Sequence, residues 1–187
     1  MLAIATPRLD LIAATAEVAR ADVADRAAFA RLLGATIPDS WPIEVMKDAQ
    51  EPVARALERG EAPLGFSMWY VVEDGILRGV IGCYGAPDSE GEVTVGYGIV
   101  PEAENRGLAT EALRGLVGWL RATGRVRAVR ATTFESHTAS VRILEKNEFV
   151  CVGISPDDAE APDSDRRERG RLMIWRREIR DRVDIGR

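Results

Sequence analysis

The chain has 187 residues, of which 46% are hydrophobic and 29% are charged, and its formal net charge is −5. This length and composition suit one domain with a sizeable core, so we expect residues 1–187 to form a single domain. The acidic balance argues against a nucleic-acid-binding protein, which usually carries an excess of basic residues.

The spacing of apolar residues predicts strands and helices along the whole chain. Alternation with a period of two predicts a strand, and recurrence every three or four residues predicts a helix. In chain order, we expect a strand over 8–13, helices over 17–33 and 43–58, strands over 65–73, 76–85 and 92–100, a helix over 107–123, a strand over 126–133, a helix over 138–146, and strands over 149–154 and 172–179.

Glycine, proline and capping residues mark several ends of these elements. Thr15 is a candidate cap for the first helix, and Gly34 ends that helix. Pro52 predicts a break in the second helix. Asp74-Gly75 is a hairpin turn signal between two strands, and Pro101 ends the strand before it because proline has no N–H to donate.

The order of the elements indicates an α/β protein built on a mixed sheet. Three consecutive strands before residue 101 favour antiparallel pairing, whereas helices that alternate with strands after it imply at least one parallel pair. We find no internal repeat and no linker, and we expect the polar segment 155–170 to be a loop.

Side chains that bind metals or form disulfides are few. Cys83, Cys151 and His137 supply fewer ligands than the roughly four that a structural zinc site needs, and they make no disulfide framework. Both cysteines lie in apolar, strand-like stretches, so we expect them to be buried. The first ten residues lack the pattern of a signal peptide, and no apolar run approaches the ~20 residues of a membrane helix. The sequence therefore predicts a cytoplasmic protein without a metal.

The segment 96–113 carries the clearest indication of chemistry. A strand ends at Pro101, a polar loop follows, and a long helix begins near Gly107. The first turn of a helix has unpaired N–H groups and attracts phosphate, Gly107 allows close approach to the backbone, and Arg106 adds a cation. The residues alone leave open a pyrophosphate site or a plain helix start. The Walker and Rossmann glycine patterns are absent.

Two motifs in order resemble those of the GNAT superfamily of N-acetyltransferases. Glu104-Asn-Arg-Gly-Leu-Ala109 is similar to the family's acetyl-CoA motif Gln/Arg-x-x-Gly-x-Gly/Ala, with Glu104 at the Gln/Arg position. The segment 137–149 resembles the family's Asn-x-Ala-Ser-x-x-x-Leu-Glu-Lys-x-Gly-Phe signature, with His137 for Asn and Glu148 for Gly. The opening Thr6-Pro-Arg-Leu-Asp-Leu11 is similar to the first strand of the RimJ/RimL-like branch, which acetylates ribosomal proteins.

The resemblance implies both a fold and a reaction. The fold is a central, splayed, mostly antiparallel sheet flanked by helices. The reaction is direct transfer of the acetyl group of acetyl-CoA to a primary amine of a protein N-terminus, a peptide or a small molecule. The residues that would contact acetyl-CoA are Tyr97, Ile99, Val100, Asn105, Arg106, Gly107, Leu108, Ala109, Thr110, His137 and Ser140. Glu104 is expected to point into solvent, because a carboxylate beside a pyrophosphate is unfavourable.

The same resemblance implies where catalytic groups would lie. Many relatives carry a carboxylate base on the strand before the phosphate loop, where this chain has Thr94. Glu92 lies two residues earlier and so on the same strand face, and we predict it as the base; a solvated charge at the start of the strand is the alternative. Leu144 stands where some relatives have a tyrosine acid. Ser140 matches the serine near the CoA sulfur in the RimJ/RimL-like branch and is our predicted acid, unless its hydroxyl only bonds to backbone.

The remaining predictions concern the acceptor and other partners. Trp41, expected to be exposed, and Trp69 are candidates for lining the acceptor pocket, with core packing as the alternative. The acidic stretch within 157–168 would attract a cation or be a solvated loop. His137 is predicted to contact the cofactor or to be a plain helix-start residue. The resemblance allows a homodimer. A protein that binds acetyl-CoA as a sensor or partner module, without turnover, is the alternative function.

Overall fold

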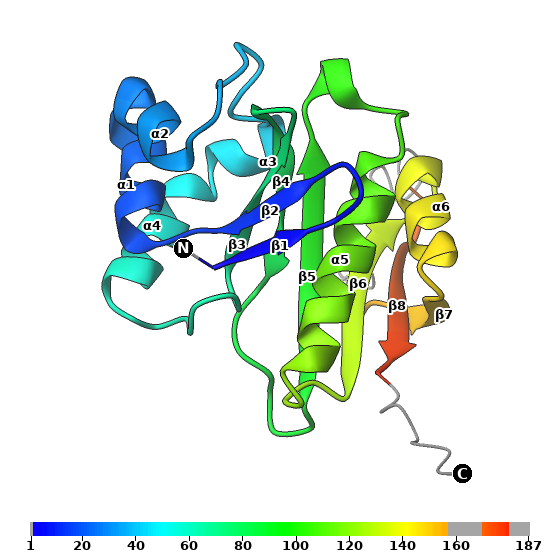
Figure 1. Cartoon of the computed structure of the whole chain (residues 1–187). Coiled ribbons are helices and arrows are strands. Elements are labelled where there is room, and N and C mark those ends of the chain that lie inside the picture. The colour runs from blue at the N-terminus through cyan, green and yellow to red at the C-terminus, as the bar shows by residue number, and fades with distance from the viewer. Residues whose placement is uncertain (1, 157–169, 180–187) are drawn as a thin grey trace, which may run out of the picture. The chain divides into compact units, whose positions relative to one another are not determined.

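The computed structural model describes residues 2–156 and 170–179 (Figure 1). These residues form two compact units, the first made of 2–86 and 96–119 and the second of 87–95, 120–156 and 170–179. Strand β5 (Glu92–Ile99) and helix α5 (Leu108–Ala122) each continue from one unit into the other. The strands hydrogen-bond in the order β1-β2-β3-β4-β5-β6-β8-β7.

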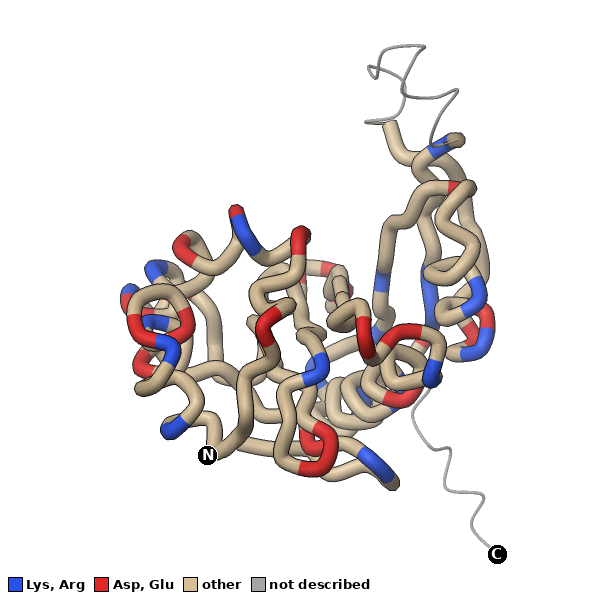
Figure 2. The backbone as a smooth tube through the Cα atoms, turned by 90° about the horizontal axis from the view of Figure 1, so that it is seen from above, with Lys and Arg blue, Asp and Glu red and all other residues tan. Residues whose placement is uncertain are grey.

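The first unit combines the N-terminal strands with a group of short helices. Strands β1, β2, β3 and β4 pair antiparallel in sequence order. Arg20 of α1 forms ion pairs of 2.7 Å with Glu51 and Glu58 of α4. Figure 2 shows that acidic and basic residues are interspersed along the chain. The elements that lie wholly in this unit are β1 (Ala3–Ala5), β2 (Asp10–Ala13), α1 (Ala16–Ala24), α2 (Arg26–Leu33), α3 (Glu44–Lys47), α4 (Gln50–Glu58), β3 (Met68–Glu73), β4 (Ile76–Cys83) and the short 3-10 helix η1 (Pro101–Ala103).

Both faces of β3 are covered, so every residue of this strand is buried. Tyr70 packs against Phe29 of α2, with ring centroids 5.0 Å apart. Trp69 points to the opposite face, as neighbours in a strand do, and meets Trp119 of α5 edge-on at 5.1 Å. Gly65 permits this contact, because a Cβ there would lie 2.4 Å from the Trp119 ring. The unit therefore has apolar layers on both sides of its sheet.

The second unit contains β6 (Ala128–Phe134), α6 (Thr138–Lys146), β7 (Val150–Ile154) and β8 (Leu172–Glu178). Strand β6 pairs antiparallel with β8 along all seven of its residues, and β8 pairs antiparallel with β7. The first part of β5 pairs parallel with β6 over three residue pairs, from Glu92–Ala128 to Thr94–Arg130. The predicted α/β class with a mixed, mostly antiparallel sheet flanked by helices is thereby confirmed.

Both predicted N-terminal helices are in fact divided in two. Asp25 has an extended backbone that ends α1, and its carboxylate accepts hydrogen bonds from the N–H groups of Ala27 and Ala28, which begins α2. The break in the second predicted helix falls at residues 48–49, and Pro52 lies in the first turn of α4. Proline is tolerated there because first-turn N–H groups have no partner within the helix.

The exposure expected for Trp41 and for Cys151 is wrong, and two further points concern β1 and the segment 157–168. Trp41 is buried rather than exposed, with 4% of its surface accessible. Cys83 is buried as predicted, but Cys151 is exposed on β7. Strand β1 was not predicted. The acidic segment 157–168 lies outside the described residues.

Candidate functional site

The loop that precedes α5 has a backbone shaped by two left-handed residues. Helix η1 (Pro101–Ala103) turns the chain away from β5. Asn105 then has φ 58° and Gly107 has φ 79°, and α5 begins at Leu108. Left-handed backbone costs most residues roughly 1–2 kcal/mol, but glycine avoids the cost and asparagine reduces it. The sequence therefore favours this sharp turn immediately before a helix N-terminus.

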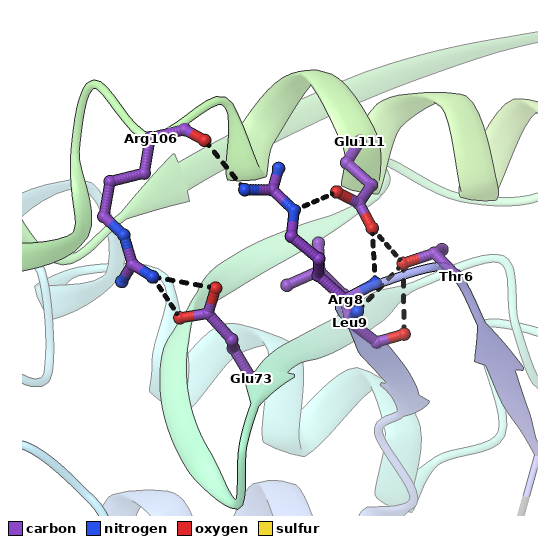
Figure 3. Close-up of polar contacts among 6 residues, drawn as sticks. All are labelled: Thr6, Arg8, Leu9, Glu73, Arg106 and Glu111. Carbon is purple, nitrogen blue, oxygen red and sulfur yellow. Dashed lines mark hydrogen bonds and ion pairs between the residues drawn. The ribbon is translucent and has the colours of Figure 1, made fainter.

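Hydrogen bonds and an ion pair connect Thr6 and Arg8, near the start of the chain, to this loop and to α5 (Figure 3). Nη1 of Arg8 donates to the carbonyl oxygen of Arg106 at 3.1 Å. Nε of Arg8 donates to Oε2 of Glu111 at 2.7 Å, and its backbone N–H donates to Oε1 at 2.8 Å. The hydroxyl of Thr6 lies 2.7 Å from the same Oε1. The loop carbonyl is thus held by a guanidinium that Glu111 of α5 itself positions.

Glu111 is suited to its place in the first turn of α5. Partial burial acts to raise its pKa, but the hydrogen bonds from Thr6 and Arg8 outweigh that effect and hold the pKa below its ordinary value. A carboxylate near a helix N-terminus also interacts favourably with the helix dipole. Glu111 therefore braces the loop as an anion.

The side chains of the loop leave its backbone accessible. Glu104 is exposed, as predicted, and so are Asn105 and Gly107. Arg106 is 45% exposed and donates from Nη2 to Oε1 of the buried Glu73 at 3.0 Å. A helix N-terminus with a nearby guanidinium is a physically reasonable site for a phosphate group. Leu108 and Ala109, also predicted to contact the cofactor, are buried at the start of α5.

The two predicted residues of α6 differ in exposure. Ser140 is buried in the first turn, at 7% accessible, whereas His137 is the exposed residue before the helix and makes no side-chain capping bond there. Leu144 is fully buried on the same helix. These residues belong to the second unit, whereas the loop before α5 belongs to the first.

Comparison with known families decides which kind of protein has this loop. The acetyltransferase (GNAT) domain family matches residues 8–150, about three quarters of the chain. The chain belongs to the GNAT acetyltransferase family. The family that the two motifs predicted is confirmed, and the protein is an acyltransferase.

Individual relatives of this GNAT acetyltransferase are distant. The uncharacterized N-acetyltransferase YjdG of Bacillus subtilis (strain 168) is 24% identical over 120 residues, covering 63% of this chain and 71% of YjdG. RimL, a ribosomal L7/L12 alpha-N-protein acetyltransferase solved with coenzyme A, superposes with TM-score 0.65 at 17% identity, covering 95% of this chain and 98% of that one. A Salmonella typhimurium acetyltransferase that modifies the N-terminal serine of L7/L12 gives 0.66 at 17% identity, covering 96% and 100%. These structures establish the shared fold.

Glu92, the predicted base of this acetyltransferase, has a structural task within the second unit. Arg130 and Arg176 lie directly opposite each other on β6 and β8, an arrangement in which like charges repel. Oε1 of Glu92 accepts hydrogen bonds of 2.9 and 2.7 Å from Arg176, and Oε2 lies 2.8 Å from Nε of Arg130. Glu92 is 7% exposed. It therefore neutralises a pair of arginines, and its role as base stays a prediction.

The two tryptophans predicted for the acceptor pocket are core residues of the first unit. Nε1 of Trp41 donates to Oδ1 of Asp22 at 2.7 Å, and its ring lies 6.1 Å from that of Tyr70. Trp69 is fully buried and donates from Nε1 to the carbonyl of Gly65 at 2.8 Å. Their contacts are those of core packing, the alternative considered for both. Lining a pocket would require accessible surface that Trp69 does not have.

The other predicted cofactor residues lie close together along the chain. Tyr97 and Ile99 are half-buried on β5, Val100 is buried after it, and Thr110 is half-buried in the first turn of α5. Sequence reasoning missed Glu73, which contacts Arg106. A charged residue at the end of an otherwise apolar strand was the available signal.

Among residues 2–156 and 170–179, no group of three or more His, Cys, Asp or Glu side chains is placed to hold a metal ion. Within the same ranges, no helix has the length and apolar character needed to cross a bilayer.

Proposed function

We propose that this GNAT acetyltransferase takes the acetyl group from acetyl-CoA and transfers it directly to a primary amine, as a cytoplasmic enzyme. The observation that carries the proposal is the braced loop before α5, in which a helix N-terminus and Arg106 offer donors to a phosphate group. The residues between β5 and α5 fit a pyrophosphate, because the two acidic side chains there, Glu102 and Glu104, are exposed and Gly107 places no side chain over its backbone.

The transfer needs two proton movements and one bond exchange. The lone pair of the amine nitrogen attacks the thioester carbonyl carbon, and the C–S bond then breaks to release the thiolate of CoA. The nitrogen loses a proton to a base, and the thiolate gains one from an acid or from water. We assign stabilisation of the tetrahedral oxyanion to backbone N–H groups of the segment 97–99 at the end of β5, as preorganised donors on a rigid strand; the N–H of Val100 donates to the carbonyl oxygen of Arg78.

Glu92 and Ser140 are our assignments for the two proton transfers. Oε1 of Glu92 accepts two hydrogen bonds from Arg176, whereas Oε2 lies 2.8 Å from Nε of Arg130 without an aligned hydrogen bond, so Oε2 is the atom that would receive a proton. Ser140 would donate to the thiolate from the first turn of α6. Glu92 is paired with two arginines, and Leu144 stands where some relatives have a tyrosine acid. Both features favour a second candidate function, an acetyl-CoA-binding module without turnover.

A protein or peptide N-terminus is the first acceptor to test. Two of the similar structures are those of enzymes named for acetylation of ribosomal protein L7/L12, and their 17% identity leaves a small amine as the second class. A homodimer is the assembly to test beside the monomer.

The experiment measures CoA release with acetyl-CoA and a panel of N-terminal peptides and small amines. We expect release above the rate of hydrolysis for at least one amine, with the acetyl group found on nitrogen by mass spectrometry. Micromolar binding of acetyl-CoA without release for any amine would favour the binding module. Equal affinity for acetyl-CoA and ATP would refute both candidates.

A further inference from the structure

Glu73 is a buried carboxylate on β3 that contacts Arg106 of the phosphate loop, the residues 104–107 before α5. It is the last residue of β3 and is 4% exposed. Nη2 of Arg106 lies 3.0 Å from its Oε1 and 2.9 Å from its Oε2, and Nε of Arg78 lies 3.2 Å from Oε2. Burial of a carboxylate is costly unless it is paired. Two guanidinium groups supply that pairing here.

The two arginines do not contact Glu73 in the same way. Arg106 makes an aligned hydrogen bond to Oε1, whereas neither Oε2 nor Nε of Arg78 has an aligned partner among the described residues. Arg78 therefore acts mainly through its charge, and Arg106 is held in a defined direction. Figure 3 shows a single nitrogen of Arg106 directed at the carboxylate.

The rest of the Arg106 side chain remains accessible. Its side chain is 45% exposed, while that of Glu73 is 5% exposed. A guanidinium carries five N–H donors in a rigid fork, so engagement of Nη2 leaves Nε and Nη1 as donors. Arg8 meanwhile holds the backbone carbonyl of the same residue. The loop arginine is thus fixed at both its backbone and its side chain.

We propose that Glu73 is a positioning residue for the phosphate loop, which orients Arg106 so that its remaining donors meet a phosphate group of the CoA moiety. The inference rests on the proposed function, because it concerns the same donor site. Fixing the side chain before binding removes the entropy loss of ordering it during binding. A carboxylate near an anion would by itself weaken binding through repulsion. The two effects predict opposite changes when the carboxylate is removed, so a binding measurement separates them.

The experiment is calorimetric titration of CoA into the wild type, Glu73→Gln, Arg106→Gln and the double variant. Loss of a hydrogen bond to a charged group is expected to weaken CoA binding roughly tenfold in Glu73→Gln, which corresponds to about 1.4 kcal/mol. Pantetheine, which lacks phosphate groups, should bind with unchanged affinity. When Arg106 is already glutamine, adding Glu73→Gln should have no further effect on the affinity for CoA.

Glu51→Gln is the matched control. Glu51 is also shared by two arginines, Arg20 and Arg55, but it lies on α4 and contacts no residue of the loop. It should bind CoA as the wild type does. If Glu73→Gln does not fold, Arg106→Lys tests the same point, because a lysine has one ammonium group in place of a fork and should show the same loss for CoA only.

Several results would overturn the proposal. One is unchanged or tighter CoA binding by a folded Glu73→Gln. Another is a loss of pantetheine affinity equal to the loss of CoA affinity. A third is a roughly tenfold loss of CoA affinity when Glu73→Gln is added to Arg106→Gln. Wild-type affinity of Arg106→Lys would overturn it as well. Failure of the wild type to bind CoA would instead count against the proposed function, so the two failures are distinguishable.

Discussion

Substitution of Glu92 by glutamine removes one negative charge from between two arginines. Glu92 is 7% exposed, and it alone stands between Arg130 and Arg176 in the ion pairs found among the described residues. Arg130 and Arg176 face each other across the β6–β8 ladder. Without the carboxylate, the two guanidinium groups repel each other at a cross-strand position. We therefore expect Glu92→Gln to lower the free energy of unfolding.

The size of this effect follows from the exposure of the partners. Breaking a fully buried ion pair costs roughly 3–5 kcal/mol, because it leaves a charge uncompensated. Arg130 is 48% exposed and Arg176 is 29% exposed, so water screens both, and the amide still accepts a hydrogen bond. These factors reduce the expected loss to about 2 kcal/mol, or roughly 4–8 °C in Tm for a chain of this length.

Thermal unfolding followed by circular dichroism measures this loss, with Glu178→Gln as the matched control. Glu178 also pairs with Arg176 but is 57% exposed, so its replacement should change Tm by less than about 2 °C. A Tm of Glu92→Gln equal to that of the control would refute the reasoning. The catalytic assignment has a separate readout: a base predicts a kcat at least ~100-fold lower, and an unchanged kcat would leave Glu92 with its structural task alone.

Three more predictions concern the first unit and the two cysteines. Gly79→Ala would place a Cβ 2.2 Å from the carbonyl oxygen of Gly98, a backbone atom that cannot move aside; chemical denaturation should show a loss of about 2–3 kcal/mol, and wild-type stability would contradict the close approach. Burial raises the pKa of Asp22 above its ordinary 3.8 despite hydrogen bonds from neighbours, so its contribution to stability is complete below pH 3.8 and is lost as pH rises through the higher folded-state pKa. Asp22→Asn should remove that part of the pH dependence of unfolding, and an identical pH profile would contradict it. Burial raises the pKa of Cys83 to about 12, while Cys151 is exposed; alkylation of the native protein at pH 8 should therefore modify Cys151 first by mass spectrometry, and equal rates would count against the burial of Cys83.

The elements of the fold were largely predictable because their signals are local. Apolar spacing located α5 and α6, and Gly34 and Asp74-Gly75 mark ends that depend only on backbone preference. The division at Asp25 was not predicted, because an aspartate within an apolar repeat reads equally well as a surface residue or as a cap. Strand β1 has only three residues and is defined by its pairing with β2, which no local pattern reveals.

The residues of the candidate site that are neighbours in the sequence could be predicted. The loop glycine and the helix after it are adjacent in sequence, so Gly107 and Arg106 could be named from their spacing. The partners of that loop, Arg8 and Glu73, come from strands far away in the chain. The contacts of Glu92 were not predictable for the same reason. Arg130 and Arg176 follow it by 38 and 84 residues in the sequence, and only the pairing of β5, β6 and β8 brings the three side chains together.

Isothermal titration of the purified protein with acetyl-CoA, with ATP as the competing anion, tests the central claim most directly. The account predicts specific micromolar binding of acetyl-CoA that Gly107→Val weakens at least tenfold, because a β-branched side chain at φ 79° would distort the loop backbone. Binding of ATP and acetyl-CoA with the same affinity, or acetyl-CoA affinity unaffected by Gly107→Val, would contradict it.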